Sequence, residues 1–135
     1  MWPVAAALAG AMAVLLVSLF VPIGDEGDPS GLVFALAGDG VSGSAEVGPA
    51  DAGWWIRLQM PGLDPAPEGS YYEGWVSDGT DWVSVGTFHM REGDYVLLWS
   101  GVPMTDYPEL LVTREVVADG PSPSGDVVAT GRLSD

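Results

Sequence analysis

The chain is divided sharply between an apolar segment and a charged remainder. Residues 2–23 contain no Asp, Glu, Lys or Arg, and every charged side chain lies from Asp25 onward. As a helix this segment would extend about 33 Å, which matches the hydrocarbon core of a bilayer at about 30 Å. The sequence therefore predicts a transmembrane anchor over residues 1–24, a polar linker over 25–30 and one further domain over 31–135.

Two other interpretations of the apolar segment stay open. A cleaved signal peptide has a basic start, a shorter apolar stretch and a small-residue cleavage site. Here no basic residue precedes Asp25, and the one plausible cleavage triplet, Ala35–Ala37, lies well beyond the apolar end. A buried core helix is the other alternative. The length and composition favour the uncleaved anchor over both.

The orientation of the anchor is not given by the usual count of basic residues. That count uses Lys and Arg close to the span, and the nearest one here is Arg57. The short uncharged N-terminus and the acidic residues Asp25, Glu26 and Asp28 are compatible with export. We therefore expect a single-pass protein of the cell membrane whose C-terminal domain is extracytoplasmic.

Charge and cysteine content exclude several classes of function. The chain has 19 acidic residues against four basic ones, for a net charge of −15, which repels phosphate backbones. We therefore expect no nucleic-acid partner. The absence of cysteine removes disulfides, thiolate nucleophiles and cysteine-based metal sites. His89 is the only histidine, so the sequence offers no ordinary zinc site, and we expect no metal or other cofactor.

A hydrophobic period of two begins after the apolar segment. Apolar residues at 54, 56, 58 and 60 alternate with residues 55, 57 and 59, as in a strand with one buried face. Similar short runs occur at about 31–37, 41–48, 70–77, 82–89, 95–100, 109–117 and 127–133. Gly, Pro and Asp separate them, as in turns. The pattern predicts an all-β domain, an antiparallel Greek-key β-sandwich of the immunoglobulin-like type with seven or eight strands.

Five short motifs follow one another in a familiar order. They are Val41–Val47, Tyr72–Val76, Val85–Phe88, Val112–Glu115 and Pro123–Val128. Together they resemble the extracytoplasmic domain of the anti-sigma-K factor family of bacteria. The resemblance implies a sandwich outside the membrane, joined through one span to a cytoplasmic, zinc-dependent domain that binds a sigma factor. It also implies mainly structural roles for the motif residues Tyr72, Trp75, Gly86, Thr87, Phe88, Thr113, Glu115 and Gly125.

The chain also departs from the family pattern. At most Met1 and Trp2 precede the apolar span in this sequence, so we expect a stand-alone or truncated relative, whose sigma-binding part is lost or encoded separately, that does not sequester a sigma factor by that means. Gly74 replaces a large apolar residue, and Ser124 replaces a threonine. These changes affect local packing more than the fold.

Four aromatic and acidic residues have specific expected positions. Tyr72 and Trp75 lie three residues apart, so a regular strand points them to opposite faces, whereas a bulge at Gly74 would turn both inward. Glu115 shares a face with Thr113 and precedes the loop at 119–125, so we expect it to accept hydrogen bonds from loop amides. Alternation places Trp55 outward, as a candidate for exposed contact.

Three functions from different classes follow. The first is a non-enzymatic, membrane-anchored regulatory or sensor domain that acts by protein contact or by regulated proteolysis, with a sigma/anti-sigma component or a membrane protease as partner. The second is a cell-surface module that binds a glycan or wall polymer, which requires Trp55, Trp75 and Trp82 to form one exposed strip. The third is an enzyme, for which the sequence shows no acid/base pair, nucleophile or metal-ligand set, so we expect none.

Overall fold

The computed structural model describes residues 31–90, 95–117 and 120–134, and this part of the chain is built from strands without a helix. The strands are β1 (Leu32–Gly38), β2 (Val41–Ala50), β3 (Gly53–Gln59), β4 (Ser70–Ser77), β5 (Trp82–Phe88), β6 (Val96–Ser100), β7 (Glu109–Val116) and β8 (Val127–Arg132). Each expected run coincides with one strand to within two residues. The all-β class is therefore confirmed.

The expected anchor over residues 1–24 and linker over 25–30 lie outside the described residues. Within the described ranges, the structure contains no helix with the length and apolar character needed to cross a membrane.

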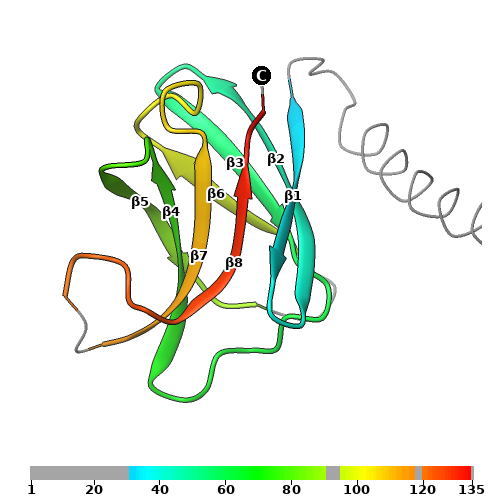
Figure 1. The fold of residues 1–135 in the computed structure, drawn as a ribbon, viewed down its shortest axis with the longest axis vertical. Coiled ribbons are helices and arrows are strands. Elements are labelled where there is room, and N and C mark those ends of the chain that lie inside the picture. Colours follow the sequence, from blue (N-terminus) through cyan, green and yellow to red (C-terminus); the bar gives the residue numbers. More distant parts are fainter. Residues whose placement is uncertain (1–30, 91–94, 118–119, 135) are drawn as a thin grey trace, which may run out of the picture. The chain divides into compact units, whose positions relative to one another are not determined.

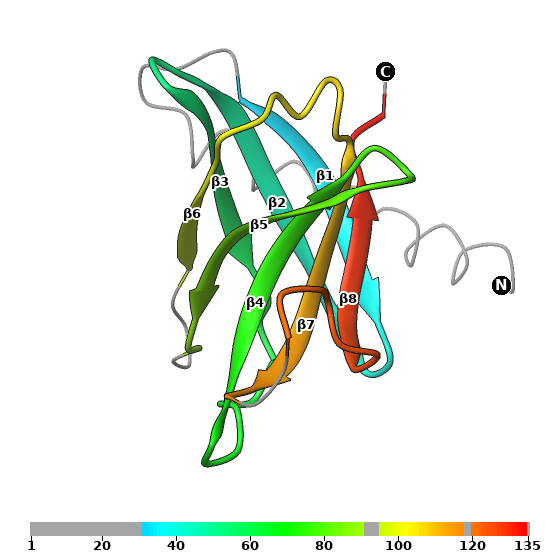
Figure 2. The same cartoon turned by 90° about the vertical axis from the view of Figure 1, so that its left-hand side faces the viewer.

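The eight strands form one antiparallel sheet in the order β5-β4-β7-β8-β1-β2-β3-β6 (Figure 1). The sequence led us to expect a sandwich of two sheets, and this expectation is wrong: β1 pairs with β8 through Ala37 and Thr130, so all eight strands belong to one continuous sheet. The close approach at this seam depends on glycine, because a side chain at Gly131 would meet the Ala35 carbonyl oxygen at 2.4 Å. The sheet curls until its edge strands β5 and β6 touch, which makes it nearly barrel-like (Figure 2).

The core lies inside this curl and follows the period of two. On β3, Ile56 and Leu58 are fully buried, while Arg57 between them is half-buried on the outer face. The rings of Tyr72 and Phe88, from neighbouring strands, lie 5.7 Å apart in the core. Complete burial of each such apolar side chain contributes about 1.5–3 kcal/mol, so the inward face holds the two halves together.

The β4–β5 hairpin turns through the expected Asp78–Asp81 segment. Asp78 Oδ1 accepts hydrogen bonds from the amides of Thr80 at 2.9 Å and Asp81 at 2.8 Å, and Gly79 has a φ of 100°. Asp78 therefore closes the turn with its side chain, as Asp commonly does in tight turns.

The same hairpin contains a bulge. Its pairing shifts between Gly74 and Trp75, so that Gly74 faces Gly86 while Trp75 faces Ser84. The extra residue lies on β5, and Gly86 beside it has a φ of 129°, which strongly favours glycine.

Candidate functional site

Trp75, Thr113 and Glu115 come together on the outer face of β4 and β7. Trp75 Nε1 donates a hydrogen bond to Thr113 Oγ1 at 2.9 Å, and the Thr113 hydroxyl donates in turn to Glu115 Oε2. All three side chains are buried, with 3%, 0% and 1% of their surface exposed. Trp75 does not join the core cluster that contains Tyr72, so the strand is regular along the β7 pairing and the two rings are buried on opposite faces.

The β7–β8 loop covers this network. Glu115 Oε2 accepts a hydrogen bond from the Ser124 amide at 3.0 Å, and the Ser124 hydroxyl donates to the Arg114 carbonyl oxygen at 2.7 Å. The loop folds back over β4 and β7 in Figure 2. Glu115 thus makes the loop contact expected of it, and it links the loop through Thr113 to the buried Trp75.

Tyr72 holds a second loop, between β3 and β4. Its hydroxyl donates a hydrogen bond to the Asp64 carbonyl oxygen at 2.6 Å, while its ring is buried against the core. The loop also contains its own turns, since the Leu63 amide bonds the Met60 carbonyl at 3.1 Å and the Ser70 amide bonds the Pro67 carbonyl at 2.9 Å. This proline-containing loop is therefore tied to the sheet at its centre and at both ends.

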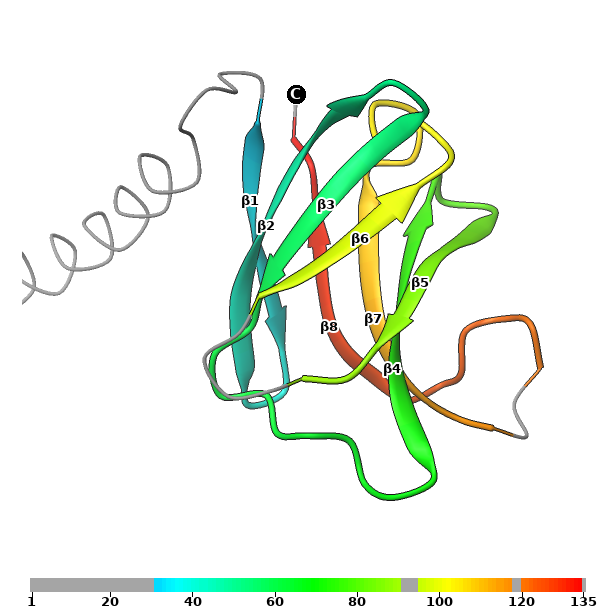
Figure 3. The same ribbon diagram turned by 180° about the vertical axis from the view of Figure 1, so that it is seen from behind.

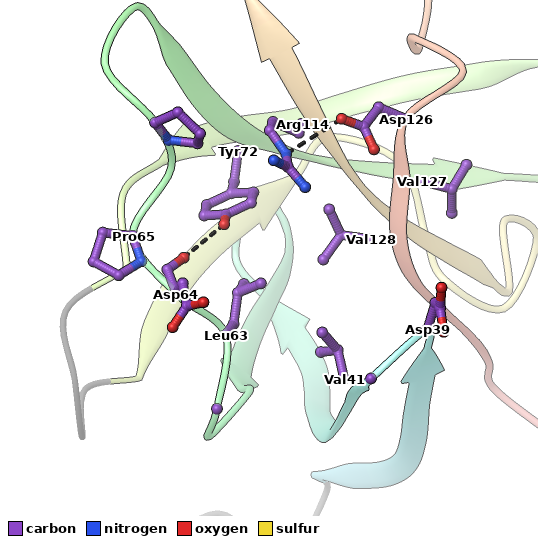
Figure 4. Close-up of a pocket in the computed structure, with 13 residues that line it drawn as sticks. Asp39, Val41, Leu63, Asp64, Pro65, Tyr72, Arg114, Asp126, Val127 and Val128 are labelled. Carbon is purple, nitrogen blue, oxygen red and sulfur yellow. Dashed lines mark hydrogen bonds and ion pairs between the residues drawn. The ribbon is translucent and has the colours of Figure 1, made fainter.

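The two anchored loops border one cleft of about 510 Å³ at this end of the sheet (Figure 4). The β3–β4 loop and Tyr72 form one wall, the start of β8 forms another, and the β1–β2 turn closes the third side. The cleft is lined by Asp39, Gly40, Val41, Gly62, Leu63, Asp64, Pro65, Pro67, Tyr72, Arg114, Asp126, Val127 and Val128. It is a concave surface whose exposed lining is more polar than apolar, with Val41, Leu63 and Val128 among the side chains that border it.

The electrostatics of the cleft are set by one arginine and three aspartates. Arg114 Nε lies 3.2 Å from Asp126 Oδ2, an ion-pair distance, but the geometry leaves this buried nitrogen without a hydrogen bond among the described residues. The carboxylates of Asp39 and Asp64 are on the exposed margin. Burial raises the pKa of the Tyr72 phenol; Arg114 opposes this shift, and Asp64 and Asp126 reinforce it.

The remaining motif residues have separate positions. Phe88 is in the core against Tyr72, Gly86 is in the bulge, and Thr87 is exposed on β5 opposite Glu73. Gly125 is exposed in the β7–β8 loop, where a side chain would meet only open space. The structure thus brings Trp75, Thr113 and Glu115 into one network, and leaves these four outside it.

Trp55 has a partner that the sequence did not indicate. It pairs directly with Trp99 across β3 and β6, on the outer face that Figure 3 shows from the front. Trp99 is 56% exposed, and Leu97 and Tyr95 nearby are 48% and 59% exposed. The strip of Trp55, Trp75 and Trp82 that a glycan-binding module was expected to need is not formed, because Trp75 is buried. The exposed aromatic surface lies on β3 and β6 instead.

Other candidate sites are weaker. In the described ranges, no three His, Asp or Glu side chains gather closely enough to hold a metal ion, and His89 is exposed. A shallower hollow of about 390 Å³ lies beside Trp82 and Arg132, whose guanidinium pairs with Glu109 at 2.8 Å.

A scan of the chain against protein-family models finds no match, and searches of curated proteins and of solved structures find none either.

Proposed function

We propose that this chain is a membrane-anchored, extracytoplasmic regulatory domain that binds a protein partner through the cleft between the β3–β4 and β7–β8 loops. It resembles the corresponding domain of anti-sigma-K factors, with an immunoglobulin-like Greek-key arrangement of its strands. The partner is a component of a sigma/anti-sigma system or a membrane protease, and no catalytic step is assigned to the domain. The membrane part of the proposal rests on the apolar residues 2–23.

One observation supports this function above the others: residues of the family motifs anchor both loops that border the cleft. Tyr72 bonds the β3–β4 loop at Asp64, and Glu115 bonds the β7–β8 loop at Ser124. The Tyr72 contact lies in the cleft itself, whereas the Ser124 contact reaches the cleft through Asp126, whose amide donates a hydrogen bond to the Ser124 hydroxyl at 3.3 Å. A loop that is fixed before binding loses less entropy on association, so such anchors favour recognition.

The charge of the cleft indicates the kind of partner segment. Asp39, Asp64 and Asp126 outnumber Arg114, and Arg114 is already paired with Asp126. The net charge of −15 adds a long-range field of the same sign. Opposite charge steers association and favours matching partners, so the cleft suits a basic segment with some apolar side chains.

The proposal is tested by affinity purification of the full-length protein, tagged after Asp135 and crosslinked in its native membranes, with mass spectrometry of the recovered proteins. The test variant is Asp39→Lys/Asp64→Lys, which reverses two charges on the margin of the cleft. The matched control is Asp51→Lys/Asp81→Lys, which has the same net charge but alters turns at the opposite end of the sheet. Both pairs of side chains are exposed, so neither variant disturbs the core.

We expect a sigma/anti-sigma component or a membrane protease in the wild-type sample. The amount of this partner recovered with the cleft variant should be at least about ten-fold lower than with the wild type, while the control variant should recover the wild-type amount. Equal loss in both variants would show that total charge, rather than the cleft, attracts the partner. Recovery of wall material without any specific protein would refute the regulatory function.

A further inference from the structure

The outer face of β3 and β6 combines an aromatic platform with a polar centre. We call this surface the β3–β6 face and define it by Gly48, Trp55, Arg57, Tyr95, Leu97 and Trp99. Cross-strand pairing places Trp55 opposite Trp99 and Arg57 opposite Leu97. Leu97, Trp99 and Tyr95 are each about half exposed or more, at 48%, 56% and 59%. In Figure 3 this face is turned toward the viewer, at the edge of the sheet.

The indole of Trp55 lies directly over Gly48. A side chain at Gly48 would meet Trp55 Cζ2 at 2.6 Å and Cε2 at 2.7 Å, so only glycine leaves room for the ring in this position. Gly48 is the β2 residue paired with Trp55, and Trp99 is paired with Trp55 on the other side. The Trp55 ring is thus held low against the sheet over β2, while Trp99, paired with Trp55 on the other side of β3, is 56% exposed, so aromatic side chains occur on this face over three neighbouring strands.

The polar centre is electrically balanced. Arg57 and Glu46 are paired residues of β3 and β2, and Arg57 Nη2 lies 3.4 Å from Glu46 Oε1. The guanidinium carbon is also 5.5 Å from the centre of the Tyr95 ring, within the range of a cation–π contact. The Arg57 side chain remains 32% exposed. A ligand lying across the aromatic rings would therefore meet hydrogen-bonding groups whose charges nearly cancel.

We propose that the β3–β6 face binds an uncharged glycan chain. A sugar ring has apolar C–H faces that lie flat on aromatic rings, and hydroxyl groups around its edge that both donate and accept hydrogen bonds. The Trp55–Trp99 platform matches the first property, and the Arg57–Glu46 pair matches the second. This site is separate from the proposed cleft and involves different residues.

Charge argues for this occupant over other surfaces and polymers. A net charge of −15 disfavours anionic polysaccharides, nucleic acids and anionic lipids. A bilayer would also remove water from the Arg57–Glu46 pair, which is costly for charged groups, whereas glycan hydroxyls would replace that water. An uncharged, polar chain can stack on the aromatic rings and also supply hydrogen bonds to the Arg57–Glu46 pair.

The test uses the full-length chain in a polyoxyethylene detergent, because sugar-based detergents would compete. The probes are cellohexaose and chitohexaose, two neutral hexasaccharides, titrated while tryptophan fluorescence is recorded. The variants are Trp99→Ala, which removes the exposed ring, and Gly48→Ala, which displaces the Trp55 ring without removing either tryptophan from the chain. Trp99→Phe keeps an aromatic ring, and Leu32→Ala truncates an exposed apolar side chain on β1 as a control.

We expect the wild type and Leu32→Ala to bind at least one hexasaccharide equally well. Trp99→Ala and Gly48→Ala should weaken binding by about ten-fold or more, and Trp99→Phe by clearly less. Three results would overturn the proposal: no binding of either probe by the wild type, equal binding by Trp99→Ala, or a Trp99-dependent dimer or vesicle contact in place of glycan binding. The cleft variant Asp39→Lys/Asp64→Lys should bind the hexasaccharides normally, which separates this site from the proposed protein contact.

Discussion

Replacing Thr113 with valine removes one hydroxyl from a position that water does not reach. The side chain is 0% exposed, and its Oγ1 accepts a hydrogen bond from Trp75 and donates one to Glu115. Valine has nearly the same shape and suits a β-strand equally well. The substitution therefore isolates the energetic contribution of the hydroxyl.

The expected cost follows from the two partners left behind. The Trp75 N–H and the Glu115 carboxylate are both buried, and each loses a hydrogen bond that nothing else can replace. A buried polar group left unsatisfied costs about 1–3 kcal/mol, so the two groups together should lower the free energy of unfolding by about 2–6 kcal/mol. Since Glu115 keeps the Ser124 amide, a value near the middle of this range is expected. For a domain of this size, the melting temperature would fall by about 10 °C or more.

The assay is equilibrium unfolding of the full chain in urea and a mild non-ionic detergent, followed by tryptophan fluorescence. The matched control is Thr87→Val, the same substitution at an exposed position on β5, which should change stability by less than about 0.5 kcal/mol. Combining Thr113→Val with Trp75→Phe should cost less than the sum of the single changes, because both remove the same hydrogen bond. Equal stability of Thr113→Val and Thr87→Val would refute the argument that the network is a buried, satisfied unit.

Three further predictions concern the bulge, the hairpin and the cleft wall. Gly86→Ala should destabilise the domain by about 1–3 kcal/mol, because a non-glycine residue is strained at a φ of 129°; Gly120→Ala, in open space, should not, and equal melting temperatures would contradict this. The amides of Asp81 and Thr80 lower the pKa of the Asp78 carboxyl, so its stabilising effect on the hairpin is present at neutral pH and lost as the pH falls through the folded-state pKa. NMR titration of Asp78 should show this lowered pKa, and a midpoint at or above that of an unfolded-chain Asp would contradict it. Tyr72→Phe should cost about 1 kcal/mol and speed amide hydrogen exchange in residues 60–69, and unchanged exchange there would mean that the Asp64 contact does not hold the loop.

Strand positions could be predicted from the sequence because burial on one face repeats every two residues. Ile56 and Leu58 lie inside and Arg57 between them lies on the outer face, as alternation requires. The Asp78–Asp81 turn was equally predictable, since Asp and Gly stabilise tight turns by local hydrogen bonding and backbone freedom. These features depend on neighbours along the chain.

The joining of the strands was less predictable. One residue pair, Ala37 with Thr130, joins β1 to β8 and so makes one continuous sheet instead of two. These two strands lie at opposite ends of the domain's sequence. No local pattern of hydrophobic residues encodes whether such a seam closes. The pairing of Trp55 with Trp99 was missed for the same reason, because it depends on the register between β3 and β6.

The burial of Trp75 shows a third limit. Alternation placed it on the face opposite Tyr72, and the structure does so, but Trp75 is only 3% exposed there and is hydrogen-bonded through Thr113 to Glu115, which bonds the β7–β8 loop. The bulge considered at Gly74 is present at this register, with its extra residue on β5 rather than β4. The path of the β7–β8 loop leaves no periodic pattern in the sequence. The only indication of it was the position of Glu115 just before the loop, which predicted the hydrogen bond that the structure shows with the Ser124 amide.

The central claim, that the cleft between the two anchored loops binds a protein partner, is tested most directly by site-specific photocrosslinking in native membranes. A photoreactive residue is placed at Pro65, which lines the cleft, or at Asp51, an exposed turn position at the opposite end of the sheet. The account predicts a specific crosslinked protein from position 65 that is absent from position 51. The same products from both positions, or no protein crosslinked at position 65, would contradict it.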